Sequence, residues 1–482
     1  MNDAASTPPQ RLSDATLNAV PAGIRRPCYP RDATRIGIVH LGAGAFHRAH
    51  QAVYVDDLLA DEPDWAICAV SLHGAATAEA LRPQDGLYTV AVLGSAPEYR
   101  VIGSIRQALF AGQDQKAILA RLADPQVRLV TLTVTEKGYC LGADGLDAAH
   151  PDIVHDLADP DRPRSAIGYV VAGLRARHAA GERPYTVLSC DNLADNGNRL
   201  RRATLQYAGH VDPALAAWIA GEVTFPCSMV DSITPATDAV LRERVDAALG
   251  LHDAWPVQRE AYTQWVVEDR FCNGRPRWER AGVTMSDDIA GHDRAKLRLL
   301  NAAHSTLAYL GLLRGLDSVD EAMADPELGP FVATLMHEHI APNTVMPPGL
   351  DVHAYIEAIL ARFRNPSIRH RLIQIAQDGS QKIPVRLLDT IADALAAGRP
   401  VDALCVPVAG WLRFVCRQAK CGRELTDPRN AQLQDIGCHS SGHGRHDVAA
   451  FLSLREVFGT LADDARFSDA LRQAYDALHG GR

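Results

Sequence analysis

The stretch RIGIVHLGAGAFHRAH, residues 35 to 50, constrains the fold more than any other part of the sequence. An apolar, β-branched run ends in Gly-x-Gly, and a helical pattern, FHRAHQAVYVDDLLA, follows at once. Dinucleotide-binding folds use this order because the glycines allow a tight bend and let the backbone approach a pyrophosphate closely. The predicted cofactor loop therefore consists of Gly42, Gly44, Ala45 and Phe46.

Two features of this loop depart from the usual pattern. His47 stands where the third glycine normally permits close packing of helix on strand, so either the helix lies farther out or the side chain is used. The next strand candidate ends in Ser71, Leu72 and His73, without the acidic residue that holds the adenosine ribose, and no arginine for a 2′-phosphate follows it. The choice between NAD and NADP stays open, and a tight strand-to-helix turn without a cofactor is the alternative interpretation.

The distribution of apolar runs predicts two domains behind a polar lead segment, residues 1–33. Leu and Ala at helical spacing replace β-branched runs from about residue 285 onward. We expect an α/β fold, with an N-terminal Rossmann-like doubly wound domain with extra strands over 34–285, followed by a mostly α-helical C-terminal domain over 286–482 that carries substrate and catalytic residues. The strand candidates are 35–41, 65–72, 127–135, 185–192 and 225–232.

Composition excludes several classes of protein. A formal net charge of -9 argues against a nucleic-acid partner, since such proteins present a basic surface. Ten cysteines scattered through 482 residues resemble reduced core thiols. The N-terminal residues show no signal-peptide pattern, and the apolar stretch 299–313 is too short to span a bilayer. We expect a cytoplasmic protein with a small-molecule substrate and no membrane partner.

A second group of polar residues lies in DRAKLRLLNAAHSTLAYLG. In an α-helix, Lys296, Asn301 and His304 would fall within an arc of about 140°, among leucines. Polar groups partly buried in this way need partners or a function, although a solvated helix face is the alternative. The trio suits carbonyl reduction: a desolvated lysine can give a proton near neutral pH, an amide can bind the developing oxyanion, and a histidine can orient a hydroxyl.

Two other dehydrogenase mechanisms find little support. A short-chain reductase needs Tyr followed four positions later by Lys, and none of the 12 tyrosines has this neighbour. A zinc enzyme needs a compact set of cysteine and histidine ligands. The tail carries candidates at loose spacing far from the glycine turn, so no metal is predicted; the candidates are Cys416, Cys421, Cys438, His439 and His443.

Several motifs together resemble one known family, the long-chain polyol dehydrogenases of the mannitol dehydrogenase type. They are HLGAGAFHRAHQA, TLTVTEKGYC, SCDN, FPCSMVDSITPAT, KLRLLNAAHSTLAYLG and DGSQKIP, and the resemblance runs from about residue 35 to 475. In this family a histidine in place of the third glycine is normal. The resemblance implies an NAD-dependent, zinc-independent oxidoreductase acting on CH-OH groups, a monomer, with substrate in a cleft between a nucleotide-binding half and a helical half.

The resemblance also implies roles for individual residues. Lys296 would be the general acid/base, and Asn192 and Asn301 would polarise the reacting oxygen. The remaining implied contacts are Asp231, His304 and Lys382 to substrate, and Glu136, Lys137 and Asp231 near the cofactor. Glu136 and Lys137 could equally form a structural ion pair, and Asp293 could relay protons or merely be an acid at a helix start.

Two segments, 266–279 and 365–389, most resemble the family members that interconvert D-fructuronate and D-mannonate in hexuronate catabolism. Gln374 stands where an arginine is expected in mannitol enzymes, and Ser232 replaces an expected basic residue. Basic residues in the second segment could hold a hexuronate carboxylate, or could be a solvated surface; they are Arg369, Arg371, Lys382 and Arg386. The alternatives are a mannitol or arabinitol 2-dehydrogenase and a non-catalytic nucleotide-binding protein.

Overall fold

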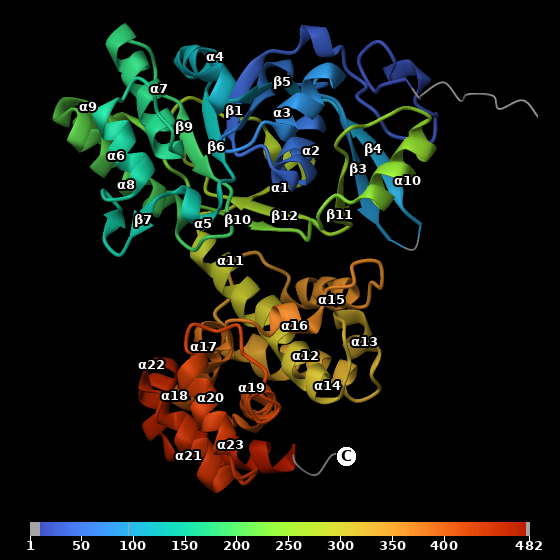
Figure 1. Cartoon of the computed structure of the whole chain (residues 1–482), viewed down its shortest axis with the longest axis vertical. Coiled ribbons are helices and arrows are strands. Elements are labelled where there is room, and N and C mark those ends of the chain that lie inside the picture. Colours follow the sequence, from blue (N-terminus) through green and yellow to red (C-terminus); the bar gives the residue numbers. More distant parts are fainter. Residues whose placement is uncertain (1–9, 95, 479–482) are drawn as a thin grey trace, which may run out of the picture. The chain divides into compact units, whose positions relative to one another are not determined.

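The computed structural model describes residues 10–94 and 96–478, and the chain divides into two compact units, Met1–Ile289 (unit 1) and Ala290–Arg482 (unit 2). Every strand found in the described residues belongs to unit 1, whereas unit 2 is helical (Figure 1). The predicted fold class, α/β followed by a helical domain, is confirmed. No helix of residues 10–94 and 96–478 is long and apolar enough to cross a membrane.

The main sheet of unit 1 has five parallel strands in the order β5-β2-β1-β6-β9. Its strands are β1 (Ile36–Leu41), β2 (Ala66–Ser71), β5 (Ile105–Phe110), β6 (Leu129–Leu132) and β9 (Thr186–Ser189). They are nearly continuous runs of apolar residues because both faces of the sheet are covered. The chain leaves β1 toward β2 on one side and later returns to β6 on the other, so the loop after β1 lies at the topological switch point.

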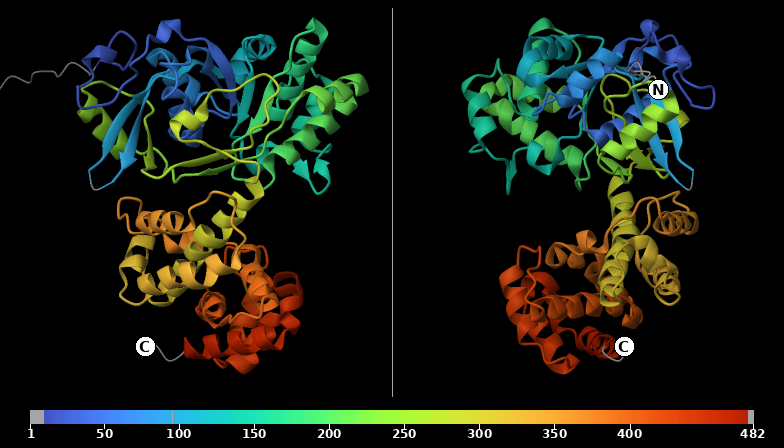
Figure 2. Two further views of the ribbon diagram at one scale, coloured as in Figure 1. Left: turned by 180° about the vertical axis from the view of Figure 1, so that it is seen from behind. Right: turned by 45° about the vertical axis from the view of Figure 1, so that its right-hand side comes forward.

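Helices cover the two faces of this sheet, and the alternation of side chains along each strand supplies a separate core to each face. Ile38 of β1 packs in one core, with residues from α1 (Ala45–Ala49), α2 (Gln51–Asp56) and α3 (Ala76–Leu81). Val39 packs in the other. The helices on that second face are α4 (Ala111–Ala123), α6 (Pro151–Ala158), α7 (Ala166–Ala180), α8 (Asn196–Val211) and α9 (Pro213–Glu222), which Figure 2 shows from two further directions.

Additional strands form three smaller sheets. The first joins β11 (Val257–Glu260), β3 (Tyr88–Leu93) and β4 (Glu98–Ile102), and α10 (Ala239–Leu249) packs against it. The second joins β10 (Ser228–Asp231), β12 (Gln264–Val267) and β13 (Thr284–Met285). The third is the hairpin of β7 (Leu141–Gly142) and β8 (Gly145–Leu146).

The strand expected over 225–232 does not join the parallel sheet. Its core is β10, which pairs antiparallel with β12. The residue directly before this segment does touch the sheet edge, since the amide of Val187 in β9 donates to the carbonyl of Thr224 at 3.0 Å. Pro226 follows, and because proline has no amide proton the pairing cannot continue along β9.

The lead segment predicted for residues 1–33 is part of unit 1 from residue 10 onward; residues 1–9 lie outside the described residues. Leu12 and Val20 are buried beside β3, β4 and α10. Arg31 is only 5% exposed and donates to the carbonyl oxygens of Gly103 and Ile105, both at 3.0 Å. A buried guanidinium satisfied by backbone carbonyls anchors the segment to the end of the sheet.

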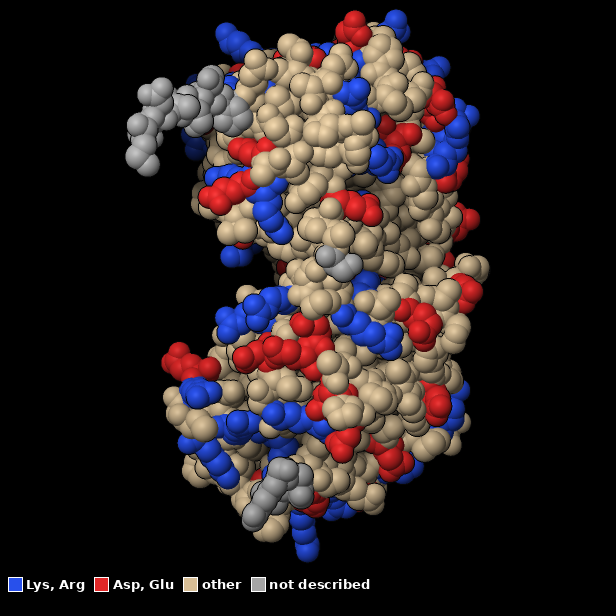
Figure 3. Space-filling view, turned by 90° about the vertical axis from the view of Figure 1, so that its right-hand side faces the viewer, with Lys and Arg blue, Asp and Glu red and all other residues tan. Residues whose placement is uncertain are grey.

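Unit 2 is built around two long buried helices, α12 (Ala302–Leu313) and α19 (Asp402–Lys420), which pack against each other. The other helices include α13 (Val319–Ala324), α14 (Leu328–Thr334), α15 (Val352–Phe363), α16 (Leu372–Ile375), α17 (Gly379–Ile383), α18 (Asp389–Ala396), α20 (Asn430–Cys438), α21 (Gly444–Leu452), α22 (Arg455–Phe458) and α23 (Ala465–Ala477). Basic and acidic side chains are interspersed on the face shown in Figure 3, and no broad basic area dominates that view.

All ten cysteines lie within the described residues and are unpaired. Most are buried, among them Cys68, whose thiol pKa burial raises to about 12. A thiol of such high pKa is inert, which matches a structural role for these buried cysteines.

Candidate functional site

The glycine turn after β1 uses its two glycines for different reasons. Gly42 has φ +98°, and a Cβ there would lie 2.1 Å from the carbonyl oxygen of Thr133, so no other residue fits. Gly44 has ordinary φ, and the nearest atom to a Cβ there is the Gly42 oxygen at 3.8 Å. The protein itself therefore leaves room beside Gly44, and a bare backbone at that position suits a close ligand such as a pyrophosphate.

His47, in the place of the third glycine, is buried beneath this turn. Its ring stacks on the ring of His40 from β1, with centroids 3.3 Å apart and planes 9° apart. The His40 ring in turn contacts the hydroxyls of Thr131 and Thr133 at 2.8 and 2.9 Å and the Gly42 oxygen at 3.1 Å. Of the two possibilities raised by the sequence, the side chain is used: it fills the space between the helix and β1.

Burial determines the charge of this histidine pair. It lowers the pKa of His40 to about 3 and the pKa of His47 well below its usual value, because both rings are removed from water. Both imidazoles are neutral at physiological pH. They act as stacked packing groups under the turn.

The single helix suggested by residues 46–60 is interrupted at His50, which has φ -125° and ψ -90°. The two pieces are α1 and α2. The Nε2 atom of His50 lies 3.0 Å from the Gln264 carbonyl oxygen, and its Nδ1 atom lies 2.9 Å from the side-chain nitrogen of Gln51. The contact with Gln264, which belongs to β12, is tertiary, and tertiary contacts of a buried ring can override the helical pattern.

Parallel pairing brings the candidate residues of unit 1 to one edge of the sheet. β1, β2, β6 and β9 point the same way, so the residues after each strand lie at the same carboxyl edge. Gly42 follows β1, His73 follows β2, Glu136 lies in the short helix after β6, and Asn192 follows β9. Glu136 and Lys137 are both described by the structure and exposed, and they do not form the ion pair that the sequence allowed.

Asp191 was not singled out by the sequence, yet it organises this edge. Its carboxylate accepts hydrogen bonds from the amides of Val134 and Thr135 at 2.9 and 3.0 Å and from the hydroxyl of Tyr139 at 2.7 Å. Burial raises its pKa. The carboxylate holds the segment around Glu136 against the end of β9, directly before Asn192. The sequence signal that could have identified Asp191 is its position, because it directly precedes the candidate Asn192 in SCDN.

Asn196 plays a similar part for the next strand. Its side-chain amide donates to the carbonyl of Ser228 at 2.8 Å and accepts from the amide of the same residue at 3.0 Å. It also donates to the Asp191 carbonyl at 3.1 Å. These bonds join the end of β9 to the start of β10, whose last residue is Asp231, 8% exposed.

In unit 2, the predicted trio lies where the helix changes its geometry. After α11 (Ile289–Ala295), the segment Lys296–Asn301 is a π-helix, and α12 continues from Ala302. A π-helix bonds residues five apart, so Lys296 and Asn301 follow one another on one side instead of lying 140° apart as α-helical geometry predicts. Lys296 is 7% exposed, which agrees with the desolvated lysine that the chemistry requires.

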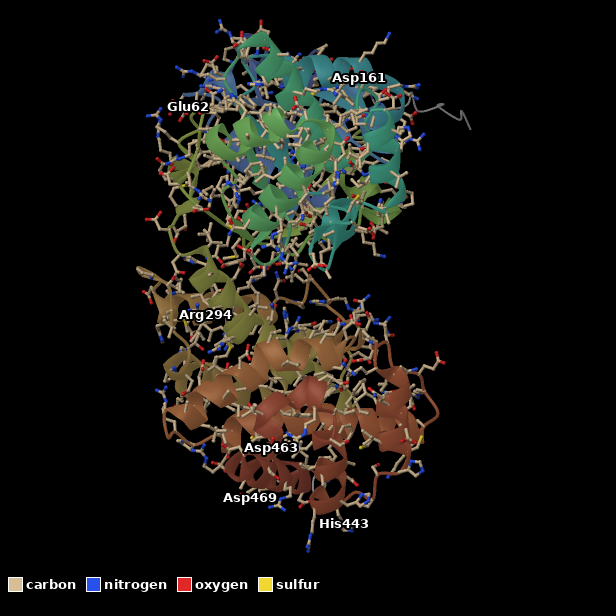
Figure 4. All side chains as sticks on the ribbon, turned by 90° about the vertical axis from the view of Figure 1, so that its left-hand side faces the viewer. Glu62, Asp161, Arg294, His443, Asp463 and Asp469 are labelled. Carbon is tan, nitrogen blue, oxygen red and sulfur yellow. The ribbon has the colours of Figure 1, made fainter. Side chains whose placement is uncertain are left out.

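Asp293 is half-buried and comes fourth after Ile289, the first residue of α11, so it lies outside the first helical turn. The interpretation of Asp293 as an acid at a helix start is therefore wrong. Its neighbour Arg294, labelled in Figure 4, donates to the Val345 carbonyl at 3.0 Å.

His304 of α12 is buried among aromatic and basic groups. Its ring lies 4.5 Å from the Phe363 ring and 5.4 Å from the His370 ring, centroid to centroid. The Nε2 atom is buried and has no hydrogen-bond partner among residues 10–94 and 96–478. Burial, and then the electrostatic effects of nearby His370, Arg362 and Arg386, hold its pKa well below the usual value, so the ring is neutral.

Two of the predicted basic residues, Arg386 and Lys382, lie next to each other and are partly buried. Arg386, in the π-helical segment Pro384–Leu388, donates to the Ser305 hydroxyl at 3.0 Å and the Asn301 carbonyl at 3.3 Å. Lys382 of α17 donates to the Ile375 carbonyl at 3.4 Å, and its pKa is lowered by burial and by Arg386. Burial lowers the pKa of Arg386 as well.

The other basic residues of this segment are placed differently. Arg369, Arg371 and Gln374 are exposed, and Arg371 precedes α16. No hydrogen bond or ion pair between described residues connects Arg371 to Lys382 or Arg386. His370, Arg362 and Phe363 were missed, because nothing in RFRNPSIRHR marks which of its residues turn inward.

Gly379 explains how Lys382 is presented. A Cβ at this position would lie 2.4 Å from the indole nitrogen of Trp411 and 2.7 Å from the hydroxyl of Tyr309, so α17 can pack on α12 and α19 only with glycine. The next residue, Ser380, donates from both its amide and its hydroxyl to Asp427, at 2.8 and 2.5 Å. The DGS motif is thus a packing contact that sets the position of Lys382, one turn later.

The cysteines and histidines of the tail form no metal site. No group of three or more His, Cys, Asp or Glu side chains in the described part of the chain could hold a metal ion. Cys416 faces the Tyr475 hydroxyl at 3.5 Å, and His443, labelled in Figure 4, directly precedes α21. The loop around His443 is shaped by the carboxylate of Asp447, which accepts from Ser441 and Gly442.

Two models of known protein families match this chain, one over its N-terminal and one over its C-terminal part. Residues 36–280 match the family model of the mannitol dehydrogenase Rossmann domain, and residues 288–479 match that of the mannitol dehydrogenase C-terminal domain. The D-mannonate oxidoreductase of Escherichia coli (strain K12) is 42% identical over 466 residues, which are 94% of this chain and 96% of that protein.

Two solved structures are similar over almost the whole chain. A D-sorbitol dehydrogenase in substrate-free form has a TM-score of 0.92 and 33% identity, covering 98% of each chain. Pseudomonas fluorescens mannitol 2-dehydrogenase in a ternary complex with NAD and D-mannitol has a TM-score of 0.78 and 36% identity, covering 98% of this chain and 97% of that one. This chain is an oxidoreductase acting on alcohol groups and belongs to the mannitol dehydrogenase family.

Proposed function

We propose that the protein interconverts D-fructuronate and D-mannonate, with NADH as hydride donor in the direction of reduction. The observation that carries the proposal is the environment of Arg386. Its guanidinium is largely buried and contacts a hydroxyl and a carbonyl, and no carboxylate lies within ion-pair distance of it among residues 10–94 and 96–478. A buried cation without a counter-ion is costly, and a substrate carboxylate would supply one.

Neighbouring charges strengthen this argument. Lys382 lies next to Arg386, and its nearest carboxylate, that of Asp378, is 3.9 Å away and 43% exposed. His304 and His370 are neutral groups in the same cluster, with lowered pKa values. The local excess of positive charge suits an anionic hexuronate better than an uncharged polyol, because a charge-assisted hydrogen bond is about twice as strong as a neutral one.

The glycine turn of unit 1 fits a nicotinamide dinucleotide, since it lies at the switch point and leaves room beside Gly44. When bound, the cofactor supplies or accepts a hydride at the carbon that carries the reacting oxygen. NAD is the proposed cofactor, in line with the ternary complex of the Pseudomonas fluorescens relative. Residues proposed to contact it are Gly42, Gly44, Ala45, Phe46 and Glu136.

Lys296 is the proposed general acid in reduction and general base in oxidation. Its ammonium group gives one proton to the carbonyl oxygen as the carbon is reduced, and the resulting neutral amine regains a proton from solvent. Asn301, on the same side of the π-helix, donates a hydrogen bond that stabilises the developing negative charge on that oxygen. Asn192 is proposed to polarise the same oxygen. Asp231, His304 and Lys382 are proposed substrate ligands, and Asp293 is the proposed proton relay for Lys296.

The test is NADH oxidation by the purified protein with D-fructuronate, D-tagaturonate and D-fructose as parallel substrates, with EDTA present throughout. We expect the highest kcat/KM with D-fructuronate. A preference for D-fructose would instead identify a polyol dehydrogenase, and binding of NADH without turnover of any sugar or uronate would identify a non-catalytic protein.

A further inference from the structure

A pocket of about 970 Å³ opens at the carboxyl end of β2 in unit 1. Leu72 and His73, which follow β2 directly, form one wall. The first turns of α4, including Lys116, form the second wall, and the segment before α7, with Arg162 and Arg164, forms the third. Residues that are distant in the sequence thus meet beyond the second strand of the nucleotide-binding sheet.

This position has a defined role in doubly wound dinucleotide-binding folds. The adenosine ribose lies at the end of the second strand, where an acidic side chain holds its 2′-hydroxyl in NAD-specific proteins, and a basic side chain accommodates a 2′-phosphate in NADP-specific ones. Here the corresponding residues are Ser71, Leu72 and His73. No carboxylate stands at the end of the strand to repel a phosphate.

The charged groups of the pocket favour an anion. Its two carboxylates are Asp114 and Asp152. That of Asp114 is already bound by the guanidinium of Arg82 and accepts from the Phe110 amide at 2.8 Å, and that of Asp152 lies 3.9 Å from the ring of His150.

The cations, by contrast, have no internal counter-ion. Asp161, labelled in Figure 4 and next to Arg162 in sequence, is paired with Arg175. The side chains of Lys116, Arg162 and Arg164 form no ion pair or hydrogen bond with any residue that the structure describes. Three cationic side chains are therefore available to a ligand in one pocket, and a phosphate is an anion that such a group binds well.

We propose that this pocket receives the 2′-phosphate of NADP(H), so that the enzyme uses NADPH as well as NADH. The inference rests on the proposed function, because it assigns the adenosine end of the same dinucleotide site. Lys116, Arg162 and Arg164 are the specificity-determining residues, and His73 takes the place of the acid that would restrict the site to NAD(H). The sequence offers no arginine next to β2, and only the fold brings these cations to it.

Binding of adenosine fragments isolates this end of the cofactor from the chemistry. The full-length protein is titrated by calorimetry with adenosine 2′,5′-bisphosphate and with 5′-AMP, and by fluorescence with NADPH and NADH. We expect the bisphosphate to bind at least as tightly as 5′-AMP, and NADPH to bind within about tenfold of NADH. A bisphosphate that binds more weakly than 5′-AMP overturns the inference and leaves the proposed function intact. Failure of all four ligands to bind would overturn both.

Variants then assign the contacts. Lys116→Ala, Arg162→Ala and Arg164→Ala should each weaken bisphosphate binding about two- to fivefold, as expected for partly exposed ion pairs, and leave 5′-AMP unchanged. His73→Asp should weaken NADPH binding at least as much, with NADH unaffected or bound more tightly. The matched control is Arg202→Ala, an exposed arginine of α8 outside the pocket. If all the variants bind the bisphosphate as tightly as the control does, the pocket does not bind the phosphate.

Discussion

The imidazole rings of His40 and His47 stack beneath the glycine turn, with ring centroids 3.3 Å apart and planes 9° apart. One ring belongs to β1 and the other to α1, so the stack joins the two elements that the turn connects. The usual third glycine lets helix and strand pack closely. Here two stacked neutral rings fill the space between α1 and β1 instead.

Replacing His47 with glycine, the residue expected by the usual pattern, should destabilise the protein. The ring is buried, and its removal leaves a cavity between α1 and β1, which costs about 2 to 4 kcal/mol of the free energy of unfolding. His47→Phe should cost less because it retains a stacked ring. Urea denaturation measures both, with the exposed His439→Gly as control. Equal stability of the glycine variant and the wild type would show that the stack contributes nothing to the fold.

The buried histidines also predict a sensitivity to acid. His40 titrates at about 3 in the folded state and near 6.5 when unfolded, so between these pH values the unfolded state binds more protons. The contribution of neutral His40 to the free energy of unfolding is then fully present above pH 6.5 and is lost as the pH drops toward 3. His40→Asn should make this fall less steep by about 1.4 kcal/mol per pH unit.

The measurement is the free energy of unfolding in urea between pH 7 and pH 4 for wild type, His40→Asn and His439→Asn. Only the slopes are compared, because the loss of contacts to Thr131 and Thr133 lowers the stability of the His40 variant at every pH. Parallel slopes for the wild type and His40→Asn would exclude His40 as a source of the acid sensitivity.

The sequence predicts those parts of the fold that depend on local pattern. The strand that leads into Gly42 is predictable because burial on both faces gives it a continuous apolar run, and the helical second half because burial of one helix face gives apolar residues at helical spacing. The strand that pairs with β10 could not be predicted from the sequence. It depends on Pro226 and on the bonds from Asn196, which are tertiary contacts with no periodic signature.

The candidate site shows the same limit. Lys296 and Asn301 were identified by residue type, but the π-helix that aligns them is a departure from regular geometry that no spacing rule anticipates. Asp191 and His370 act through contacts made across the fold. Of the basic residues in the segment 365–389, pattern alone did not separate Arg386, which turns inward, from Arg371, which is exposed.

The two glycines of the turn should respond differently to substitution. Gly42→Ala places a Cβ 2.1 Å from the Thr133 oxygen at a φ of +98°, so it should lower the free energy of unfolding by about 1 to 3 kcal/mol or more. At Gly44 the protein has room, so Gly44→Val should leave stability nearly unchanged but weaken NADH binding strongly. Thermal unfolding and NADH titration of both variants separate the effects. Normal NADH affinity in Gly44→Val would make the turn purely structural.

Lys296→Met should affect chemistry far more than binding. Loss of a general acid lowers kcat by about 10² to 10⁴, while NADH, which the lysine is not proposed to hold, should bind as before. The kcat of the variant should also lose the pH dependence that the lysine imposes. Lys420→Met, at an exposed position at the end of α19, is the matched control. A kcat equal to that of the control would remove Lys296 from the mechanism.

Arg386→Met should separate uronates from uncharged sugars. If the guanidinium binds the substrate carboxylate, its loss should lower kcat/KM for D-fructuronate by about 10- to 100-fold, as for a charged hydrogen bond of 1.5 to 3 kcal/mol. Activity with D-fructose should change much less, because that substrate has no carboxylate to lose a partner. Arg386→Lys should be intermediate, since lysine keeps the charge but cannot bind in a bidentate manner.

Arg371→Met and Lys382→Met test the other predicted carboxylate ligands, and Arg364→Met, an exposed arginine at the end of α15, is the control. Arg386 also bonds to Ser305 and to the backbone of Asn301, so a purely structural effect of its removal would lower the activity with both substrates alike. A loss shared equally by D-fructose and D-fructuronate would therefore contradict carboxylate recognition by Arg386. If Arg371→Met instead loses activity with D-fructuronate only, Arg371, at the exposed start of α16, is the residue that binds the carboxylate.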